Sequence, residues 1–301
     1  PNQYASQWFF DLQREIPGDI LLVGGYQGAK ATHLYQGRNI NNGGPHPTIP
    51  ATQRRVRPTW QGVTLRDPGF NSSYNALVLK AEKRFSRGLT FIASHTWSHN
   101  LDQGNESLDE GLSGVANPYD FRNERGNSGL DRRHSFVGSF TWELPLGRGQ
   151  SLGGGWGRGV DAVLGGWQLG GIVSLRTGFP FSVSYPGDPQ NSGTANRGDR
   201  IGKGTLANPT IDRWFDEFAF VQSAPGVFGN NGRNILFGPG SRNFDFILGK
   251  RFDLPWEGHW LQFRFESFNF TNTPTFGQPN GGLRGQSTAT INQADEPRRI
   301  Q

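Results

Sequence analysis

Cysteine and methionine are both absent from the 301 residues of the chain. The lack of cysteine excludes a disulfide framework, a thiolate metal site and a cysteine nucleophile. Because position 1 is not methionine, we expect a processed or partial segment of a longer protein. No apolar run approaches the roughly 20 residues of a membrane helix, and no signal peptide is present. An outer-membrane barrel remains open, since a barrel strand needs only about 9–11 residues of alternating character.

Charge is also scarce, at 18% of residues, while glycine (44 residues) and aromatic residues (13%) are abundant. Lysine and arginine exceed aspartate and glutamate by 30 to 25, which gives a net charge of +5. The basic residues are scattered rather than clustered, so nucleic acid is not an expected partner.

Residues alternate between apolar and polar in segments that recur along the chain, and none has a convincing helical period. We therefore predict an all-β, antiparallel, up-and-down sheet of about nine strands. The predicted strands are 4–14, 18–28, 73–85, 89–101, 132–145, 165–178, 242–253, 259–270 and a last one that begins at 298.

The predicted connections alternate in length. Residues 15–17, 86–88, 146–164 and 254–258 are short or medium, whereas 29–72, 102–131, 179–241 and 271–297 are long. Short periplasmic turns and long extracellular loops are typical of outer-membrane barrels. Long structureless loops are uncommon in compact soluble domains. The pattern thus predicts the C-terminal portion of a transmembrane β-barrel, whose missing strands come from absent chain or from another chain, because open edges in lipid leave peptide groups unpaired.

Long segments along the chain include NALVLKAEKRFSRGLTFIASHTWS, NERGNSGLDRRHSFVGSFTWELPLGRG and LQFRFESFNFTNTPTFGQPN. These segments resemble the C-terminal barrel of Oar-like TonB-dependent outer-membrane receptors, and the resemblance covers nearly the whole chain in the family's order. It implies an N-terminal carboxypeptidase-regulatory-like domain and a plug, neither of which is in this sequence. It also implies outer-membrane lipid, the TonB system and an unknown solute as partners.

Alternation assigns side chains to two faces of the predicted sheet. Facing the lumen, we expect Lys80, Glu82, Arg84, Gln262, Arg264 and Glu266, either in contact with a plug or solute or paired with one another. Facing lipid or forming the interfacial belt, we expect Phe91, His95, Trp97, Phe136, Phe140, Trp142, Leu261, Phe263 and Phe265. Trp167, Trp256 and Trp260 are expected to join Trp142 in the inner belt.

His95 and His99 would share a zinc ion only on a helix. On a strand they are about 13 Å apart, at roughly 3.3 Å per residue, so no metal site is expected. Asp102, Asn105, Glu106, Asp109 and Glu110 supply oxygen donors, but their spacing lacks the register of a calcium loop. Residues 153–159 (GGGWGRG) lack Gly-Lys-Ser/Thr and a following helix, so they are not expected to bind phosphate.

The sequence has no His-Glu-x-x-His motif and no cysteine nucleophile. We expect no enzyme activity and no cofactor. The leading hypothesis is an outer-membrane barrel segment, residues 1–301, of a TonB-dependent, Oar-like receptor or transporter, with ligand-capturing outer loops. The alternative is an extracellular or envelope structural or binding β protein assembled with other chains and not transporting. A soluble β-sheet hydrolase is a third reading.

Overall fold

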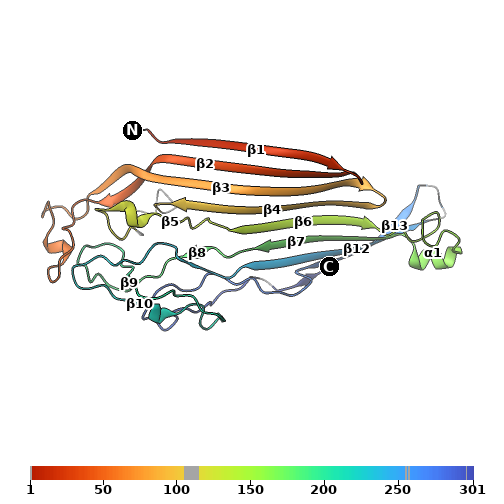
Figure 1. Ribbon diagram of the computed structural model, residues 1–301. Coiled ribbons are helices and arrows are strands. Elements are labelled where there is room, and N and C mark those ends of the chain that lie inside the picture. Colours follow the sequence, from red (N-terminus) through yellow and green to blue (C-terminus); the bar gives the residue numbers. More distant parts are fainter. Residues whose placement is uncertain (1, 105–114, 255, 257, 296) are drawn as a thin grey trace.

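The computed structural model describes residues 2–104, 115–254, 256, 258–295 and 297–301. Its main element is one antiparallel ten-stranded sheet in the order β1-β2-β3-β4-β6-β7-β12-β13-β14, with the short β5 paired to β4. Sequence neighbours thus lie side by side (Figure 1). The strands are β1 (Tyr4–Ile16), β2 (Ile20–Asn39), β3 (Thr64–Ser86), β4 (Leu89–Asp102), β5 (Gly126–Asn127), β6 (His134–Glu143), β7 (Trp167–Arg176), β12 (Ser241–Asp253), β13 (Trp260–Phe268) and β14 (Arg299–Ile300).

All nine predicted segments coincide with strands of this sheet, and the tenth strand is the two-residue β5, which alternation cannot detect. The sheet is open: within the described residues, β1 and β14 are its edges and no closed barrel forms. No described helix has the length and hydropathy of a membrane span.

The connections separate by length onto the two ends of the sheet, which we call the long-loop end and the short-turn end (Figure 1). The tightest turn joins β3 to β4 through Arg87 and Gly88, with φ of 51° and 77° and with Ser86 opposite Leu89. Two successive positive φ values match the twist of antiparallel strands, and such turns favour glycine. A Cβ on Gly88 would lie 2.6 Å from the carbonyl oxygen of Glu143, so the position also requires glycine for space.

The predicted loop 29–72 is too long at both ends, because β2 and β3 pair as far as Asn39 and Thr64. The pairing continues through register shifts between Ala31 and Leu34 and between Leu34 and Gln36. Bulges of this kind absorb irregular residues while the backbone hydrogen bonds persist. With 20 and 23 residues, both strands exceed the 9–11 that cross a bilayer, so this hairpin extends far beyond the neighbouring strands.

Two other expectations also need correction. The loop 179–241 is folded rather than structureless: β8 (Pro180–Phe181) pairs with β11 (Leu236–Phe237), and β9 (Asp199–Arg200) pairs with β10 (Phe220–Val221). The loop 271–297 also carries local structure, since isolated bridges join Phe276 to Ala294 and Gly282 to Ser184. Secondly, a helix, α1 (Arg158–Leu164), begins at the end of the glycine-rich 153–159. One turn or two of helix is too short to give a periodic signal.

Three short 3₁₀ helices complete the described elements: η1 (Ala51–Gln53), η2 (Phe121–Glu124) and η3 (Glu217–Ala219). All three lie in the long connections. Side chains cap two of them, since Asp120 accepts a hydrogen bond from the backbone N–H of Arg122, and Asp216 accepts one from that of Phe218. The long connections therefore carry local structure of their own.

Close packing across β6, β7 and β12 depends on Gly171. A Cβ there would lie 2.8 Å from ring atoms of both Phe140 and Phe244. We predict that Gly171→Ala lowers the free energy of unfolding by about 1–3 kcal/mol, as overpacking does. Urea unfolding of the folded, heat-modifiable form measures this. Gly249→Ala is the control, because its Cβ would meet nothing closer than 3.5 Å. Equal losses in both variants would contradict the prediction.

Candidate membrane interface and outer loop assembly

Strand pairing places all the predicted lipid-facing residues on one side of the sheet. Directly opposed residues of antiparallel strands point to the same face. Phe91 is opposite Phe140, His95 is opposite Phe136, and a row runs from Trp142 through Leu169 and Leu248 to Phe265. Alternation along each strand then adds Trp97, Leu261 and Phe263. We call this side the apolar face. That it contacts lipid stays a prediction.

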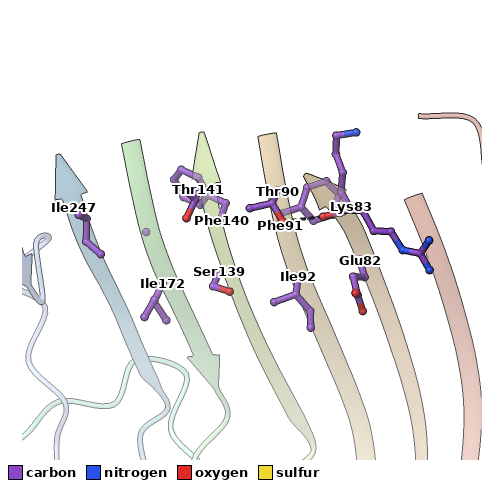
Figure 2. Close-up of a pocket in the computed structure, with 12 residues that line it drawn as sticks. Glu82, Lys83, Thr90, Phe91, Ile92, Ser139, Phe140, Thr141, Ile172 and Ile247 are labelled. Atoms are coloured by element: carbon purple, nitrogen blue, oxygen red, sulfur yellow. Dashed lines mark hydrogen bonds between the residues drawn. The ribbon is translucent and has the colours of Figure 1, made fainter. Parts of the chain in front are cut away.

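The predicted lumen-facing residues share the other side, which we call the polar face. A row of opposed residues runs from Glu82 through Ile92, Ser139 and Ile172 to Asp245, and Ile247 on the same face of β12 is opposite Glu266. Figure 2 shows several of these side chains on neighbouring strands. Lys80 pairs with Glu82 at 2.8 Å, and Arg264 pairs with Glu266. These charges thus neutralise one another along the strand.

Much of the apolar face is open, in contrast to the sheet of a soluble sandwich. Many of its large side chains remain more than a third exposed, including Phe10, Leu79, Trp97, Leu175 and Phe263. Monomeric soluble proteins rarely leave an apolar surface of this extent in water. Almost all buried apolar residues lie instead in the long connections. The apolar face therefore requires another apolar medium.

Two aromatic levels bound this face. Trp142 is opposite Leu89 at the short-turn end, and His134 is opposite Trp97 toward the long-loop end. The nine residues from Leu89 to Trp97 match the length of a spanning barrel strand, about 9–11 residues. Trp167, opposite Lys250, lies on this face at the same end as Trp142. Trp260 is at that end too, but it alternates with Leu261 and is opposite Asp253, so it points to the polar face and its predicted place in the belt is wrong. The spacing is that of a hydrocarbon band between two aromatic belts.

The two histidines that could suggest a metal site have separate partners. His95 stacks on His134 with ring centroids 5.5 Å apart, and His134 also stacks on Trp97. The Nε2 atom of His99 lies 3.1 Å from Oδ1 of Asn127. Within the described ranges, no three His, Asp or Glu side chains are arranged to hold a metal ion. Of the acidic segment considered for calcium, residues 105–114 lie outside the described residues.

The long connections pack into one body at the end of the sheet, which we call the outer loop assembly (residues 40–63, 115–133, 177–240 and 269–295). Its apolar centre joins two connections that are distant in sequence. This centre consists of Phe181, Val183, Phe215, Ala219, Phe220, Leu236, Leu283 and Ala289. Backbone hydrogen bonds from Leu283 to Ser184 and from Trp214 to Ala289, both 2.8 Å, hold the two connections together.

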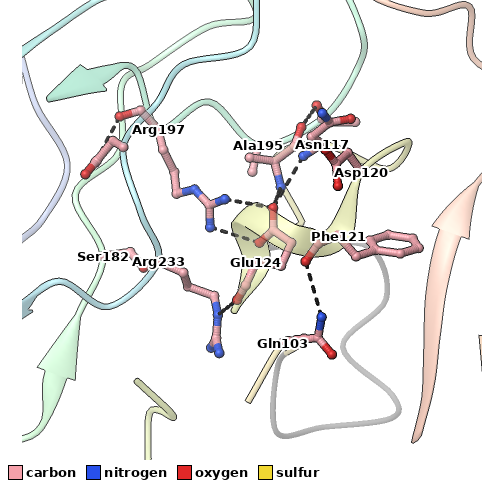
Figure 3. Close-up of polar contacts among 12 residues, drawn as sticks. Gln103, Asn117, Asp120, Phe121, Glu124, Ser182, Ala195, Arg197 and Arg233 are labelled. Carbon is pink, nitrogen blue, oxygen red and sulfur yellow. Dashed lines mark hydrogen bonds and ion pairs between the residues drawn. The ribbon is translucent and has the colours of Figure 1, made fainter. Parts of the chain in front are cut away.

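A buried charge network joins the connection 115–133 to the connection 177–240 (Figure 3). The carboxylate of Glu124, at the end of η2, is fully buried and accepts two hydrogen bonds from Arg197 at 2.7 and 2.9 Å. It also accepts one from the backbone N–H of Ala116 at 3.0 Å. Arg233 donates to the carbonyl oxygen of Glu124 at 3.2 Å and pairs with Asp102 at the end of β4. Burial lowers the pKa of Arg233 to about 10.

The tip of the β2–β3 hairpin attaches to the same body. The Asn42 side chain donates to the carbonyl oxygen of Ser192 at 3.1 Å, and Arg54 donates to that of Asn191 at 2.7 Å. Asn191 in turn donates to the carbonyl oxygen of His46 at 2.8 Å. All four long connections are therefore linked.

Two hollows open on this framework. One, of about 450 Å³, lies mostly over the polar face and is lined by Glu82, Arg84, Ser139 and Thr141 among others. The other, of about 270 Å³, lies where the extended β2–β3 hairpin meets the start of the outer loop assembly. Amide side chains line it, including Gln36, Asn71 and Gln103. Both are lined in part by hydrogen-bonding side chains.

A family model described as "Outer membrane beta barrel domain" matches residues 1–301. The chain belongs to this family. An outer-membrane location follows for this barrel domain, and outer-membrane lipid is the medium around it. No curated protein matches the chain in sequence.

Solved structures resemble this outer-membrane barrel domain at 10% sequence identity. One is the ferric-catecholate import receptor Fiu from Escherichia coli K12, with a TM-score of 0.48 over 99% of the chain and 27% of that protein. Another is the outer-membrane transporter YddB from Escherichia coli, with a TM-score of 0.46 over 99% of the chain and 32% of that protein. The chain thus spans between a quarter and a third of their lengths.

Sequence reasoning missed the charge network of the barrel domain. The sequence suggested Asp102 only as a possible calcium ligand, and no sequence pattern pointed to Glu124, Arg197 or Arg233. Glu124 is 73 residues from Arg197 and 109 from Arg233. No local spacing signals such a partnership, because it arises only when two loops pack.

Glu124 is the residue on which the network centres, and its removal leaves the buried Arg197 unpaired. We predict that Glu124→Ala destabilises the outer loop assembly by about 3–5 kcal/mol, as the loss of one partner of a buried ion pair does. Cleavage of the loops by proteinase K should become at least about tenfold faster, while the heat-modifiable shift of the barrel persists.

Arg122→Ala in the same 3₁₀ helix is the matched control. Arg122 pairs with Asp120 at 2.6 Å, but its side chain is 89% exposed. Its loss should leave the cleavage rate unchanged, since exposed ion pairs contribute little. A similar acceleration in both variants would contradict a special role of the buried network.

Proposed function

We propose that this barrel domain forms the C-terminal wall of a TonB-dependent, Oar-like receptor, and that its outer loop assembly captures a solute outside the cell. The single observation that carries the proposal is the gathering of all four linked long connections at one end of the sheet. The sequence resemblance to Oar-like receptors supports it. The role is one of binding and passage, without catalysis.

The polar face supports a passage rather than a tight binding surface. Its paired charges, such as Lys80 with Glu82 and Arg264 with Glu266, present hydration sites without net charge of one sign. In the proposed receptor, this face borders the plug and the solute. The plug and the segment that contacts TonB belong to parts of the receptor outside this sequence.

The orientation can be tested by cysteine labelling, because the chain contains no cysteine of its own. Val56 and Ile201 are 68% and 67% exposed in the outer loop assembly, and Gly149 lies in the connection at the short-turn end. In intact cells that carry the full receptor, a membrane-impermeant maleimide should label Val56→Cys and Ile201→Cys. Gly149→Cys should react only after the outer membrane is permeabilised. The reverse pattern would overturn the proposed orientation.

Solute capture can be tested by depletion of the medium. Cells with the full receptor are grown in a complex medium, and mass spectrometry compares the remaining solutes with those left by a TonB-deficient strain and by the Glu124→Ala variant. We expect at least one solute to be depleted only by the wild type. Depletion that does not depend on TonB, or no depletion at all, would favour the non-transporting envelope protein.

A further inference from the structure

The connection between β6 and β7, residues 144–166, is the longest at the short-turn end and contains α1. Four of its large apolar side chains are exposed: Leu152 at 57%, Val160 at 47%, Val163 at 64% and Leu164 at 47%. Val160, Val163 and Leu164 are spaced i, i+3 and i+4, so they form one stripe along the helix. A seven-residue helix with an uncovered apolar stripe is marginal in water.

Contacts at the C-terminal end of α1 attach it to the apolar face of the sheet. The indole N–H of Trp167 donates to the carbonyl oxygen of Val163 at 3.0 Å. The ammonium of Lys250 donates to the carbonyl oxygen of Gly165, the C-cap, and lies 4.8 and 4.9 Å from the ring centroids of Trp167 and Phe252. Lys250 is 4% exposed, so the aromatic rings and the helix terminus enclose its charge.

Trp167, Lys250 and Phe252 all belong to the apolar face, at the level of the Trp142 belt. The C-terminal end of α1, which carries Val163 and Leu164, therefore adjoins the apolar face at its boundary. The charges of this connection also suit the boundary between an apolar and a polar medium, because Arg148 and Arg158 are both exposed. The only acidic side chain of the connection, Asp161, already accepts a hydrogen bond from the backbone N–H of Arg148 at 2.7 Å.

We propose that α1, together with Leu152, lies in the headgroup region of the phospholipid leaflet at the short-turn end and anchors the barrel wall there. Amphipathic helices that lie in a membrane interface bury their apolar side to the acyl boundary and present basic side chains to the phosphates. The occupant of the stripe is thus a lipid surface and not a second protein. The inference rests on the proposed contact of the apolar face with lipid.

The absence of cysteine makes a probe experiment direct. The full receptor, otherwise free of reactive cysteine, is reconstituted into vesicles of phosphatidylethanolamine and phosphatidylglycerol. Single cysteines carry an environment-sensitive fluorophore at Val163 on the stripe, at Ala162 on the opposite side of α1, and at Leu79 in the middle of the apolar face. Ala162 is also exposed in the structure, so the first two probes differ only in direction. Each variant must retain its heat-modifiable shift, and Val160→Cys replaces Val163→Cys if the latter does not fold.

Quenching by spin-labelled phospholipid should be at least about twofold stronger at Val163 than at Ala162, and quenching by iodide should show the opposite order. Equal quenching at both positions overturns the inference, as does a Val163 probe that neither quencher reaches, which would indicate a protein partner. The Leu79 probe distinguishes a failure of the sheet's lipid contact from a failure of the α1 anchor. If lipid does not quench it, the proposed lipid contact of the sheet fails. If lipid quenches Leu79 but not Val163, only the anchor fails.

Discussion

The pairing of backbone peptide groups is the constraint on which the rest of this structure depends. In hydrocarbon, an unpaired N–H or C=O group costs several kcal/mol, so a chain that crosses a bilayer with strands must pair each strand with its neighbours. Here neighbours in sequence are neighbours in the sheet from β1 to β14. The pairing fixes the register, and the register fixes which side chains share a face. Only then do Phe91, Phe140 and Phe265, on three different strands, become parts of one surface.

The same constraint explains where this chain keeps its buried core. In the sheet, apolar side chains point outward into the surrounding medium, and burial inside the protein contributes little. Outside the membrane, water restores the usual preference for apolar burial. Phe215 and Phe220 are accordingly almost inaccessible, at 1% and 2% exposure, although both lie in a connection rather than in the sheet. The outer loop assembly thus behaves as a small globular unit attached to a membrane wall.

Polar groups in that unit obey the rule for buried charge. Glu124 and Arg197 are removed from water, and their pairing is acceptable only because two hydrogen bonds between them and further bonds to backbone groups replace the lost hydration. Arg233 links the same helix end to Asp102 at the end of β4. A few specific side-chain contacts therefore set the position of the loops relative to the sheet. The sheet itself is held by backbone hydrogen bonds that repeat along every pair of strands.

The sequence by itself determined the strands, their antiparallel order and the two faces, because alternation over about ten residues reports directly on a sheet with two different environments. It also separated long connections from short ones, as residues 179–241 and 86–88 illustrate. Only the tertiary structure decided how far β2 and β3 pair, how the long connections fold and that α1 begins at the end of the glycine-rich 153–159. Outside the membrane, pairing is no longer tied to hydropathy, and a seven-residue helix is too short to show a period. The partnership of Glu124 with Arg197 depends on two loops meeting in space, which no local pattern records.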